Sequence, residues 1–255
     1  MLTETNSSRS IRIPQDLSDG EVRAFLANVD RVLDNRPPGI VLECVALEQV
    51  VSSHINLLWQ AYLACKESGT GIKLKNASPG LVRILRVLDL YDFFIEGTGT
   101  SKIRLADYVP EEVTARSDSF RCDFPATAEA VDDALTGFLA FLDKLGLPEI
   151  LKFELRTVFY ETAMNIVDHS GLTSDCTIGF EARSNPMKID LVFRDQGKPF
   201  DLSRGKVDFD FKAAARRGQK RGFGIAMIRR LTNEVAYERM AKDTNVLTLT
   251  RNWGI

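Results

Sequence analysis

Apolar and polar residues alternate in the first part of the chain, up to about residue 108, in a pattern that predicts regular α/β structure. Short apolar runs predict strands, and longer amphipathic stretches predict helices. The expected strands cover 10–14, 37–47, 70–76 and 93–97, and the expected helices cover 21–33, 52–69 and 78–90. This alternation of strand and helix predicts an α/β layer fold.

The second part, from about residue 119, predicts a long helix over 155–171, where apolar residues recur at helical spacing. The strands expected here lie near 176–182, 187–194, 233–239 and 245–250. A further apolar-periodic helix is expected after Gly222 and Gly224. We therefore expect two domains, 1–108 and 119–255, joined by a polar linker at 109–118.

The long helix carries polar residues on one face. Glu161, Asn165 and Asp168 are spaced by four and then three positions, so they lie on the same side. Asparagine is a poor residue for a helix interior, so Asn165 needs a reason to be there. One reason is ligation of Mg²⁺, because hard cations take oxygen donors. The alternative is a buried asparagine that makes ordinary hydrogen bonds.

Two glycine-containing segments follow this helix. Asp195 ends a predicted strand, and Gly197 comes two residues later, where it permits an unusual turn. Gly222 and Gly224 precede a helix, where backbone N–H groups and the helix N-terminus favour phosphate oxygens. A single G-x-G is weak evidence, but the order E-x-x-x-N, D-x-G and G-x-G is specific.

This ordered set resembles the ATP-binding domain shared by gyrase, the heat-shock chaperone, histidine kinases and mismatch-repair ATPases, and in particular its branch of anti-sigma-factor serine kinases. The matching segments are ETAMN (161–165), DQGKPFD (195–201) and RGFGIAMIRRL (221–231), with strands in 120–131 and 243–253. The resemblance covers 119–255. It implies a two-layer α/β sandwich of the Bergerat type that binds ATP and Mg²⁺.

The resemblance also implies a role for each matching residue. Asn165 would hold the Mg²⁺, Asp195 would accept a hydrogen bond from the adenine amino group, and Gly197 would let the backbone approach the base. Glu161 would act as general base on the attacking hydroxyl, because phosphoryl transfer demands mainly positioning and charge neutralisation.

The phosphates would be held by the second glycine segment. Gly222 and Gly224 would lie against them, and Arg221 would contact them directly. The stretch 198–221 before these residues is rich in lysine and arginine. It is either a basic lid over the phosphates or a solvated surface loop.

The first part of the chain, over 8–106, resembles the STAS domain of anti-sigma-factor antagonists, which implies a mixed sheet with helices. The resemblance is carried by the order of elements and by SPGLVRILRVLDLYDFF (78–94) after a short strand. Ser52 aligns with that family's phosphoacceptor serine, although Val51 replaces an aspartate and His54 a glycine. Ser52 is thus a candidate phosphoacceptor, and the alternative is that it caps the following helix.

Composition narrows the function classes. The chain has 255 residues, 44% of them hydrophobic and 27% charged, which is typical of a globular protein. The net charge of −2 argues against direct nucleic-acid binding. No run approaches the roughly 18 apolar residues of a membrane helix, and the polar N-terminus is no secretion signal. Four scattered cysteines and two histidines indicate neither a zinc site nor a disulfide framework, so we expect a cytoplasmic protein.

These patterns and resemblances together predict an ATP- and Mg²⁺-dependent protein serine kinase of a bacterial-type partner-switching circuit. Its substrate would be a serine on a STAS antagonist domain. The implied partners are a STAS antagonist protein and a sigma factor, and homodimers are common in the resembled branch. The alternative is an ATP-gated protein-binding switch that performs no phosphotransfer.

Overall fold

The computed structural model describes residues 9–15, 17–44, 47, 50–95, 116–199 and 223–253. These residues fall into two compact units, one formed by 9–95 and the other by 116–199 together with 224–253. Both units combine helices with a sheet, so the expected fold class, two α/β domains, is confirmed. The linker expected at 109–118 lies mostly outside the described residues.

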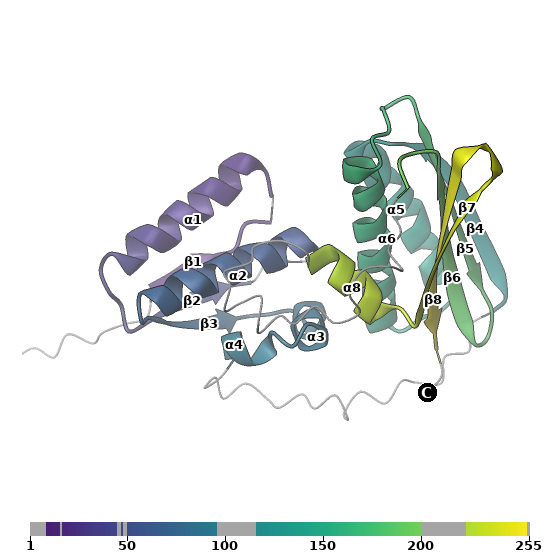
Figure 1. The fold of residues 1–255 in the computed structure, drawn as a ribbon. Coiled ribbons are helices and arrows are strands. Elements are labelled where there is room, and N and C mark those ends of the chain that lie inside the picture. Colours follow the sequence, from purple (N-terminus) through teal and green to yellow (C-terminus); the bar gives the residue numbers. More distant parts are fainter. Residues whose placement is uncertain are drawn as a thin grey trace, which may run out of the picture. The chain divides into compact units, whose positions relative to one another are not determined.

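The first unit is built on a three-stranded sheet of order β1-β2-β3, in which both pairings are parallel (Figure 1). Its elements are β1 (Arg9–Arg12), α1 (Asp19–Leu33), β2 (Gly39–Glu43), α2 (Ser52–Glu67), β3 (Gly71–Lys75), α3 (Pro79–Val87) and α4 (Tyr91–Ile95). Parallel neighbours need crossover connections, which α1 and α2 supply. Within the described residues this sheet has no antiparallel pairing, so the mixed sheet implied by the STAS resemblance is not seen there.

The segment after α3 forms a helix, α4, where a strand at 93–97 was expected. Leu90 and Phe94 are both buried and lie four positions apart, the spacing of one helix face. The Phe94 ring packs against Tyr62 of α2, with centroids 5.9 Å apart. The run Phe93-Phe94-Ile95 has high strand propensity, but packing against α2 decides its conformation.

The second unit is a five-stranded sheet of order β4-β5-β6-β8-β7, with every neighbouring pair antiparallel. Its elements are β4 (Asp118–Pro125), α5 (Ala128–Lys144), α6 (Glu149–His169), β5 (Thr177–Ser184), β6 (Lys188–Asp195), α8 (Phe223–Leu231), β7 (Glu234–Met240) and β8 (Thr244–Asn252). The helices α5 and α6 cover one face of the sheet (Figure 1). The four strands expected between 176 and 250 are confirmed.

Phenylalanine side chains join this sheet to its helices. Phe159 of α6 meets Phe180 of β5 edge to face, with centroids 4.7 Å apart, and lies 5.6 Å from Phe193 of β6. Phe138 of α5 contacts Phe180 at 5.1 Å. Each such pair adds about 0.5–1.5 kcal/mol beyond the burial of its surface. The cluster therefore fixes α6 over β5 and β6, the strand that ends at Asp195.

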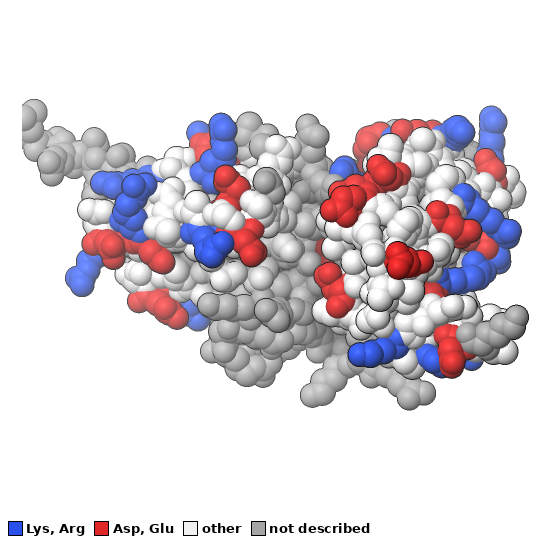
Figure 2. All heavy atoms as spheres, turned by 90° about the horizontal axis from the view of Figure 1, so that it is seen from above, with Lys and Arg blue, Asp and Glu red and all other residues white. Residues whose placement is uncertain are grey.

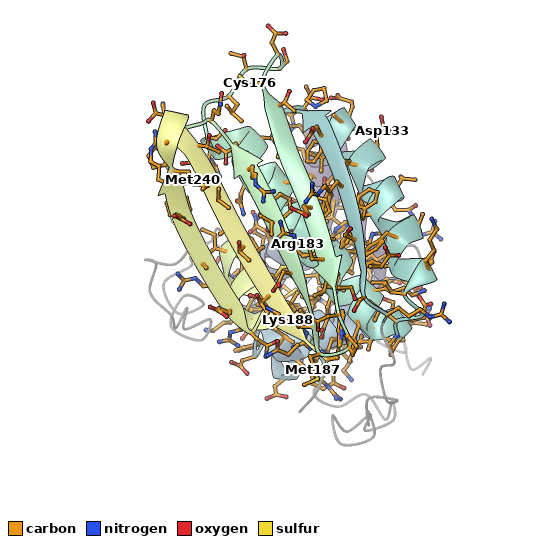
Figure 3. The ribbon with its side chains drawn as sticks, turned by 90° about the vertical axis from the view of Figure 1, so that its right-hand side faces the viewer. Asp133, Cys176, Arg183, Met187, Lys188 and Met240 are labelled. Atoms are coloured by element: carbon orange, nitrogen blue, oxygen red, sulfur yellow. The ribbon has the colours of Figure 1, made fainter. Side chains whose placement is uncertain are left out.

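The opposite face of this sheet is polar, and Figure 3 shows it with Arg183 and Lys188 labelled. Glu181 of β5 is only 3% exposed, and its carboxylate accepts hydrogen bonds from Arg183 and Arg121. These bonds, those of Arg183 above all, lower the pKa of Glu181 to about 2. The carboxylate is therefore ionised across the physiological range.

Acidic and basic side chains both occur on each unit in the view of Figure 2, in keeping with the small net charge. Within the described ranges, none of the helices combines the length and the apolar character needed to cross a membrane.

Candidate functional site

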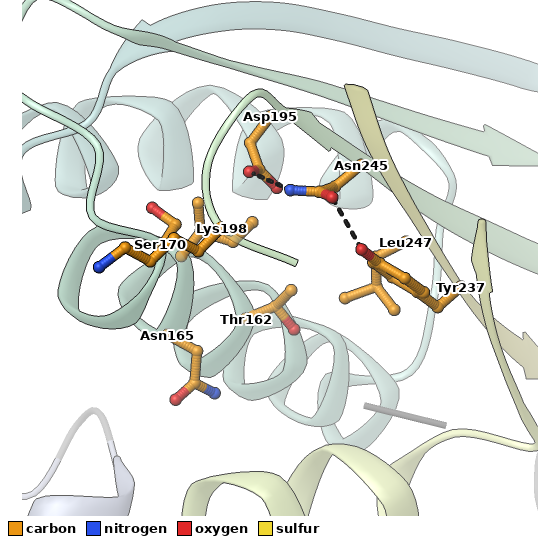
Figure 4. A pocket seen from close by; sticks show the side chains of 9 residues that line it. Thr162, Asn165, Ser170, Asp195, Lys198, Tyr237, Asn245 and Leu247 are labelled. Atoms are coloured by element: carbon orange, nitrogen blue, oxygen red, sulfur yellow. Dashed lines mark hydrogen bonds between the residues drawn. The ribbon is translucent and has the colours of Figure 1, made fainter. Parts of the chain in front are cut away.

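A pocket in the second unit lies where the end of β6 meets α6 and the β7–β8 hairpin (Figure 4). The space between its lining residues measures about 380 Å³, and this volume includes open solvent. The lining residues are Thr162, Asn165, Ile166, Ser170, Asp195, Lys198, Tyr237, Asn245 and Leu247. The fold thus brings together Asn165 and Asp195, which the sequence analysis selected from separate motifs.

Asp195 is the last residue of β6 and is 9% exposed. Its Oδ1 accepts hydrogen bonds from the Gly197 N–H at 2.7 Å and from the Asn245 side-chain amide at 2.8 Å. The first bond closes an Asx turn, in which an aspartate holds the backbone two residues on. In the described part of the chain Oδ2 has no hydrogen-bond partner. The carboxylate therefore keeps one oxygen available to a donor in the pocket.

Gly197 packs directly against the C-terminal end of α6. A Cβ at this position would lie 2.4 Å from the Ser170 Cβ and 2.8 Å from the Ser170 carbonyl oxygen. The next residue, Lys198, donates its N–H to that carbonyl at 2.7 Å. Glycine is required here because the turn after β6 approaches the helix end too closely for any side chain.

Asn245 of β8 forms hydrogen bonds to both Asp195 and Gly197 of this turn. Its Nδ2 donates to the Asp195 Oδ1 and, at 3.1 Å, to the Gly197 carbonyl. Its Oδ1 accepts from the Tyr237 hydroxyl at 2.7 Å and from the Arg239 guanidinium at 3.1 Å. Asn245 is 3% exposed, and sequence reasoning missed it. A buried asparagine in an otherwise apolar and β-branched strand is the signal that could have found it.

Asn165 and Glu161 lie one turn apart on α6 but differ in their surroundings. Asn165 lines the pocket, and its Nδ2 is buried without a hydrogen-bond partner in the described structure. An unpaired buried donor costs about 1–3 kcal/mol, so a ligand that supplied an oxygen would relieve that cost. Glu161 is buried at 6% exposure and is not among the lining residues. Asp168, on the same face, is exposed and does not line the pocket either.

The second glycine segment is described only in part. Gly224 is the second residue of α8, so it lies within the helix and does not precede it as expected. Arg221 and Gly222 lie outside the described residues. Lys198, from the predicted basic stretch, does line the pocket and brings a positive charge to it.

Ser52 belongs to the first unit and is the first residue of α2. The N-cap position is held by Val51, so the expectation that Ser52 caps this helix is wrong. The His54 Nδ1 accepts the Val51 N–H at 3.3 Å, the bond that an N3 side chain makes to the N-cap residue in a capping box. His54 is 4% exposed, and its burial lowers its pKa to about 4, opposed by the nearby backbone of Gln15 and Pro14. The imidazole is therefore neutral and able to accept at neutral pH.

The pocket's polar groups fit a nucleotide with Mg²⁺. The Asp195 oxygen that has no partner among the described residues suits an exocyclic amine, and the Asn165 Nδ2, which has none there either, suits a phosphate oxygen. Magnesium takes hard oxygen ligands and keeps several waters beside phosphate oxygens, so the Asn165 Oδ1 would serve as one of its protein ligands. Lys198 would neutralise phosphate charge. Ile166 and Leu247 provide apolar walls.

Comparison with known proteins gives one family match. The model of the histidine kinase-like ATPase domain matches residues 124–251, just over half of the chain. No curated protein matches the chain.

Two solved structures are similar at low identity. One is that of the RsbU and RsbW domains of Rv1364c from Mycobacterium tuberculosis, with 16% identity, a TM-score of 0.38, and 53% of this chain and 32% of that chain covered. The other is the SiaB-SiaC complex from Pseudomonas aeruginosa, with 14% identity, a TM-score of 0.43, and 54% of this chain and 90% of that chain covered. The chain thus spans about a third of the length of the first structure.

Proposed function

The chain belongs to the histidine kinase-like ATPase domain family, and on that premise we propose that it is an ATP- and Mg²⁺-dependent protein serine kinase of a partner-switching circuit. Its substrate is a serine on a STAS antagonist domain. The family membership supports ATP binding, and the serine kinase activity is the finer proposal drawn from the motifs at 161–165, 195–201 and 221–231.

One observation supports the proposal. The pocket combines a hydrogen-bond acceptor suited to the base of a nucleotide with donor and cationic groups suited to its phosphates. Asp195 leaves one carboxylate oxygen without a described partner, and the apolar residues Ile166 and Leu247 line the same pocket. Asn165, whose donor is buried and unpaired, and Lys198 supply the groups for phosphates and Mg²⁺. A ligand with an amine-bearing ring at one end and phosphates at the other would satisfy both.

The proposed roles of the residues are consistent with these positions. ATP, when bound, supplies the phosphoryl group that is transferred. Asp195 would accept a hydrogen bond from the base amine, and Asn165 would hold Mg²⁺ through Oδ1 and donate from Nδ2 to a phosphate oxygen. Lys198 offsets the phosphate charge. Glu161, buried one turn from Asn165, takes the proton of the attacking serine hydroxyl.

The remaining site residues of the proposal belong to the second glycine segment. Gly222 and Arg221 contact the phosphates, and Gly224 in the first turn of α8 leaves the helix N-terminus open to an anion. A backbone without side chains can approach phosphate oxygens closely.

The first unit is proposed to be a STAS-like domain that carries Ser52 as candidate phosphoacceptor. Ser52 begins α2, and a phosphate on it would be stabilised by the positive end of the helix. The proposed partners are a separate STAS antagonist and a sigma factor, with a homodimer as the assembly and the cytoplasm as the location.

The test is phosphotransfer from labelled ATP with Mg²⁺, with and without a STAS antagonist protein, followed by location of the phosphoserine. We expect label on the antagonist, and we expect Asp195→Asn to weaken ATP binding by one to two decades. A charged hydrogen bond is worth about 1.5–3 kcal/mol, which corresponds to that change. Unchanged ATP affinity in Asp195→Asn would remove Asp195 from the base site.

An ATP-gated protein-binding switch is the second candidate, and the position of Glu161 outside the pocket lining favours it. In that case Mg-ATP changes the affinity for the partner, measured by calorimetry, while no phosphoserine forms on it. The same two measurements on one protein preparation therefore decide between the candidates.

A further inference from the structure

Three side chains of the β7–β8 hairpin form a hydrogen-bonded chain to Asp195: Asn245 directly, and Tyr237 and Arg239 through Asn245. Figure 4 shows the bonds that link Asp195, Asn245 and Tyr237. We propose that Tyr237 and Arg239 are positioning residues for the base-binding carboxylate of Asp195, and that they act through Asn245. This inference rests on the proposed function, in which Asp195 binds the base.

The orientation of the Asn245 amide follows from the chemistry of its neighbours. A guanidinium can only donate, so the atom that faces Arg239 must be the amide oxygen. A carbonyl and an ionised carboxylate can only accept, so the atom that faces Gly197 and Asp195 must be the amide nitrogen. Four bonds of the correct polarity therefore hold one orientation, and a flipped amide would lose all of them except a reversed bond to the Tyr237 hydroxyl.

This orientation determines which oxygen of Asp195 remains available. Oδ1 accepts from Asn245 and from the Gly197 N–H, so it has no further role. The side chain cannot rotate to exchange its two oxygens without breaking both bonds. Oδ2 is thereby held in place for a donor on the ligand, and little freedom remains to be lost when the ligand binds.

The register of the hairpin places the supporting side chains. Arg239 and Asn245 are direct cross-strand partners, and Tyr237 lies two residues before Arg239, on the same face. Arg239 is also anchored at the hairpin end, where its other guanidinium nitrogen donates to Asp243 at 2.8 Å. A single guanidinium thus joins the hairpin end to the amide that holds Asp195.

The test compares Tyr237→Phe with the control Glu238→Gln, an exposed neighbour in the same strand. Affinity is measured by calorimetry for Mg-ATP and for Mg-tripolyphosphate, which has no base. We expect Tyr237→Phe to bind Mg-ATP about 3–10-fold more weakly, the effect of one hydrogen bond, and tripolyphosphate unchanged. Arg239→Ala should change the ATP affinity in the same direction, and Glu238→Gln should leave both affinities unchanged.

A double-mutant cycle locates the effect. In an Asp195→Asn background, Tyr237→Phe should cause no further loss, because the carboxylate that it positions is absent. Equal loss of ATP and tripolyphosphate binding, or an undiminished effect in the Asp195→Asn background, overturns the inference and leaves the proposed function intact. Wild-type ATP affinity in both Tyr237→Phe and Arg239→Ala would also overturn the inference and leave the proposed function intact. A wild-type protein that binds no ATP overturns the proposed function and this inference with it.

Discussion

Gly197→Ala perturbs one contact, between the turn after β6 and the end of α6. The added Cβ would lie 2.4 Å from the Ser170 Cβ, 2.8 Å from the Ser170 carbonyl oxygen and 2.9 Å from its Oγ. Carbon atoms pack at about 3.5–4.0 Å, so either the turn or the helix end must move by about 1 Å. The turn is tied to the helix by the bond from Lys198 to the same carbonyl, so the strain cannot be relieved locally.

The expected cost is that of overpacking a well-packed contact, about 1–3 kcal/mol. For a unit of this size, such a loss lowers the midpoint of thermal unfolding by about 3–12 °C. Because Asp195 and Gly197 share the Asx turn, the displaced backbone also moves the carboxylate. We therefore expect weaker Mg-ATP binding together with the lower stability.

The assay is urea unfolding followed by fluorescence of Trp253 in a Trp59→Phe background, so that the signal reports the second unit alone. The control is Glu238→Gln, at an exposed position of the same unit. Ser170→Gly in the Gly197→Ala background removes two of the three close atoms and should restore part of the lost stability. If Gly197→Ala unfolds at the wild-type urea concentration and binds ATP normally, the steric argument for glycine is wrong.

Four further outcomes are expected. The pKa of His54 is near 6.5 in the unfolded chain and about 4 in the folded one, so the free energy of unfolding falls by about 3 kcal/mol as the pH drops through this range. Urea titrations at pH 7 and pH 4 should show this loss, and the His54→Gln variant should lack it. Glu161→Gln should retain Mg-ATP affinity while phosphotransfer falls about 10²–10⁴-fold, whereas Asn165→Ala should weaken Mg-ATP binding itself; the same defect in both would refute this division of roles. Incubation with Mg-ATP should add one phosphate to the wild type and none to Ser52→Ala by intact mass, and a wild type left unmodified while it phosphorylates a separate STAS protein contradicts the phosphoacceptor role. Glu181, with a folded pKa near 2, stabilises the sheet above pH 4.5, and this contribution disappears as pH falls from about 4.5 to 2; Glu181→Gln should flatten the pH dependence of unfolding in that interval.

Local pattern accounted for most of the elements. The strands near 176–182, 187–194 and 245–250 were predicted because their apolar residues alternate or run continuously, and these patterns reflect burial in any sheet. The ends of the elements were less well predicted. The helix α6 begins at Glu149, six residues before the start of the helix predicted over 155–171. None of the predicted elements covered α5, although Val131, Leu135, Phe138 and Leu142 are buried on one of its faces.

The errors arose where tertiary contacts override local preference. The run at 93–97 has strand propensity, yet Phe94 packs as part of a helix against Tyr62. Ser52 is a favoured N-cap residue, but Val51 holds that position, and the buried imidazole of His54 accepts the Val51 N–H.

The sequence by itself determined the order of the motifs and two pocket residues, Asn165 and Asp195, because each motif is local and needs only its own residue types and spacing. Only the tertiary structure decided that Asn245, Tyr237 and Arg239 are linked to Asp195 by hydrogen bonds, since the sheet places β8 beside β6 and β7 beside β8. Only the structure, likewise, showed why position 197 must be glycine. Steric exclusion by a helix end and hydrogen bonds between strands depend on distances in space, and a linear pattern of apolar and polar residues does not encode those distances.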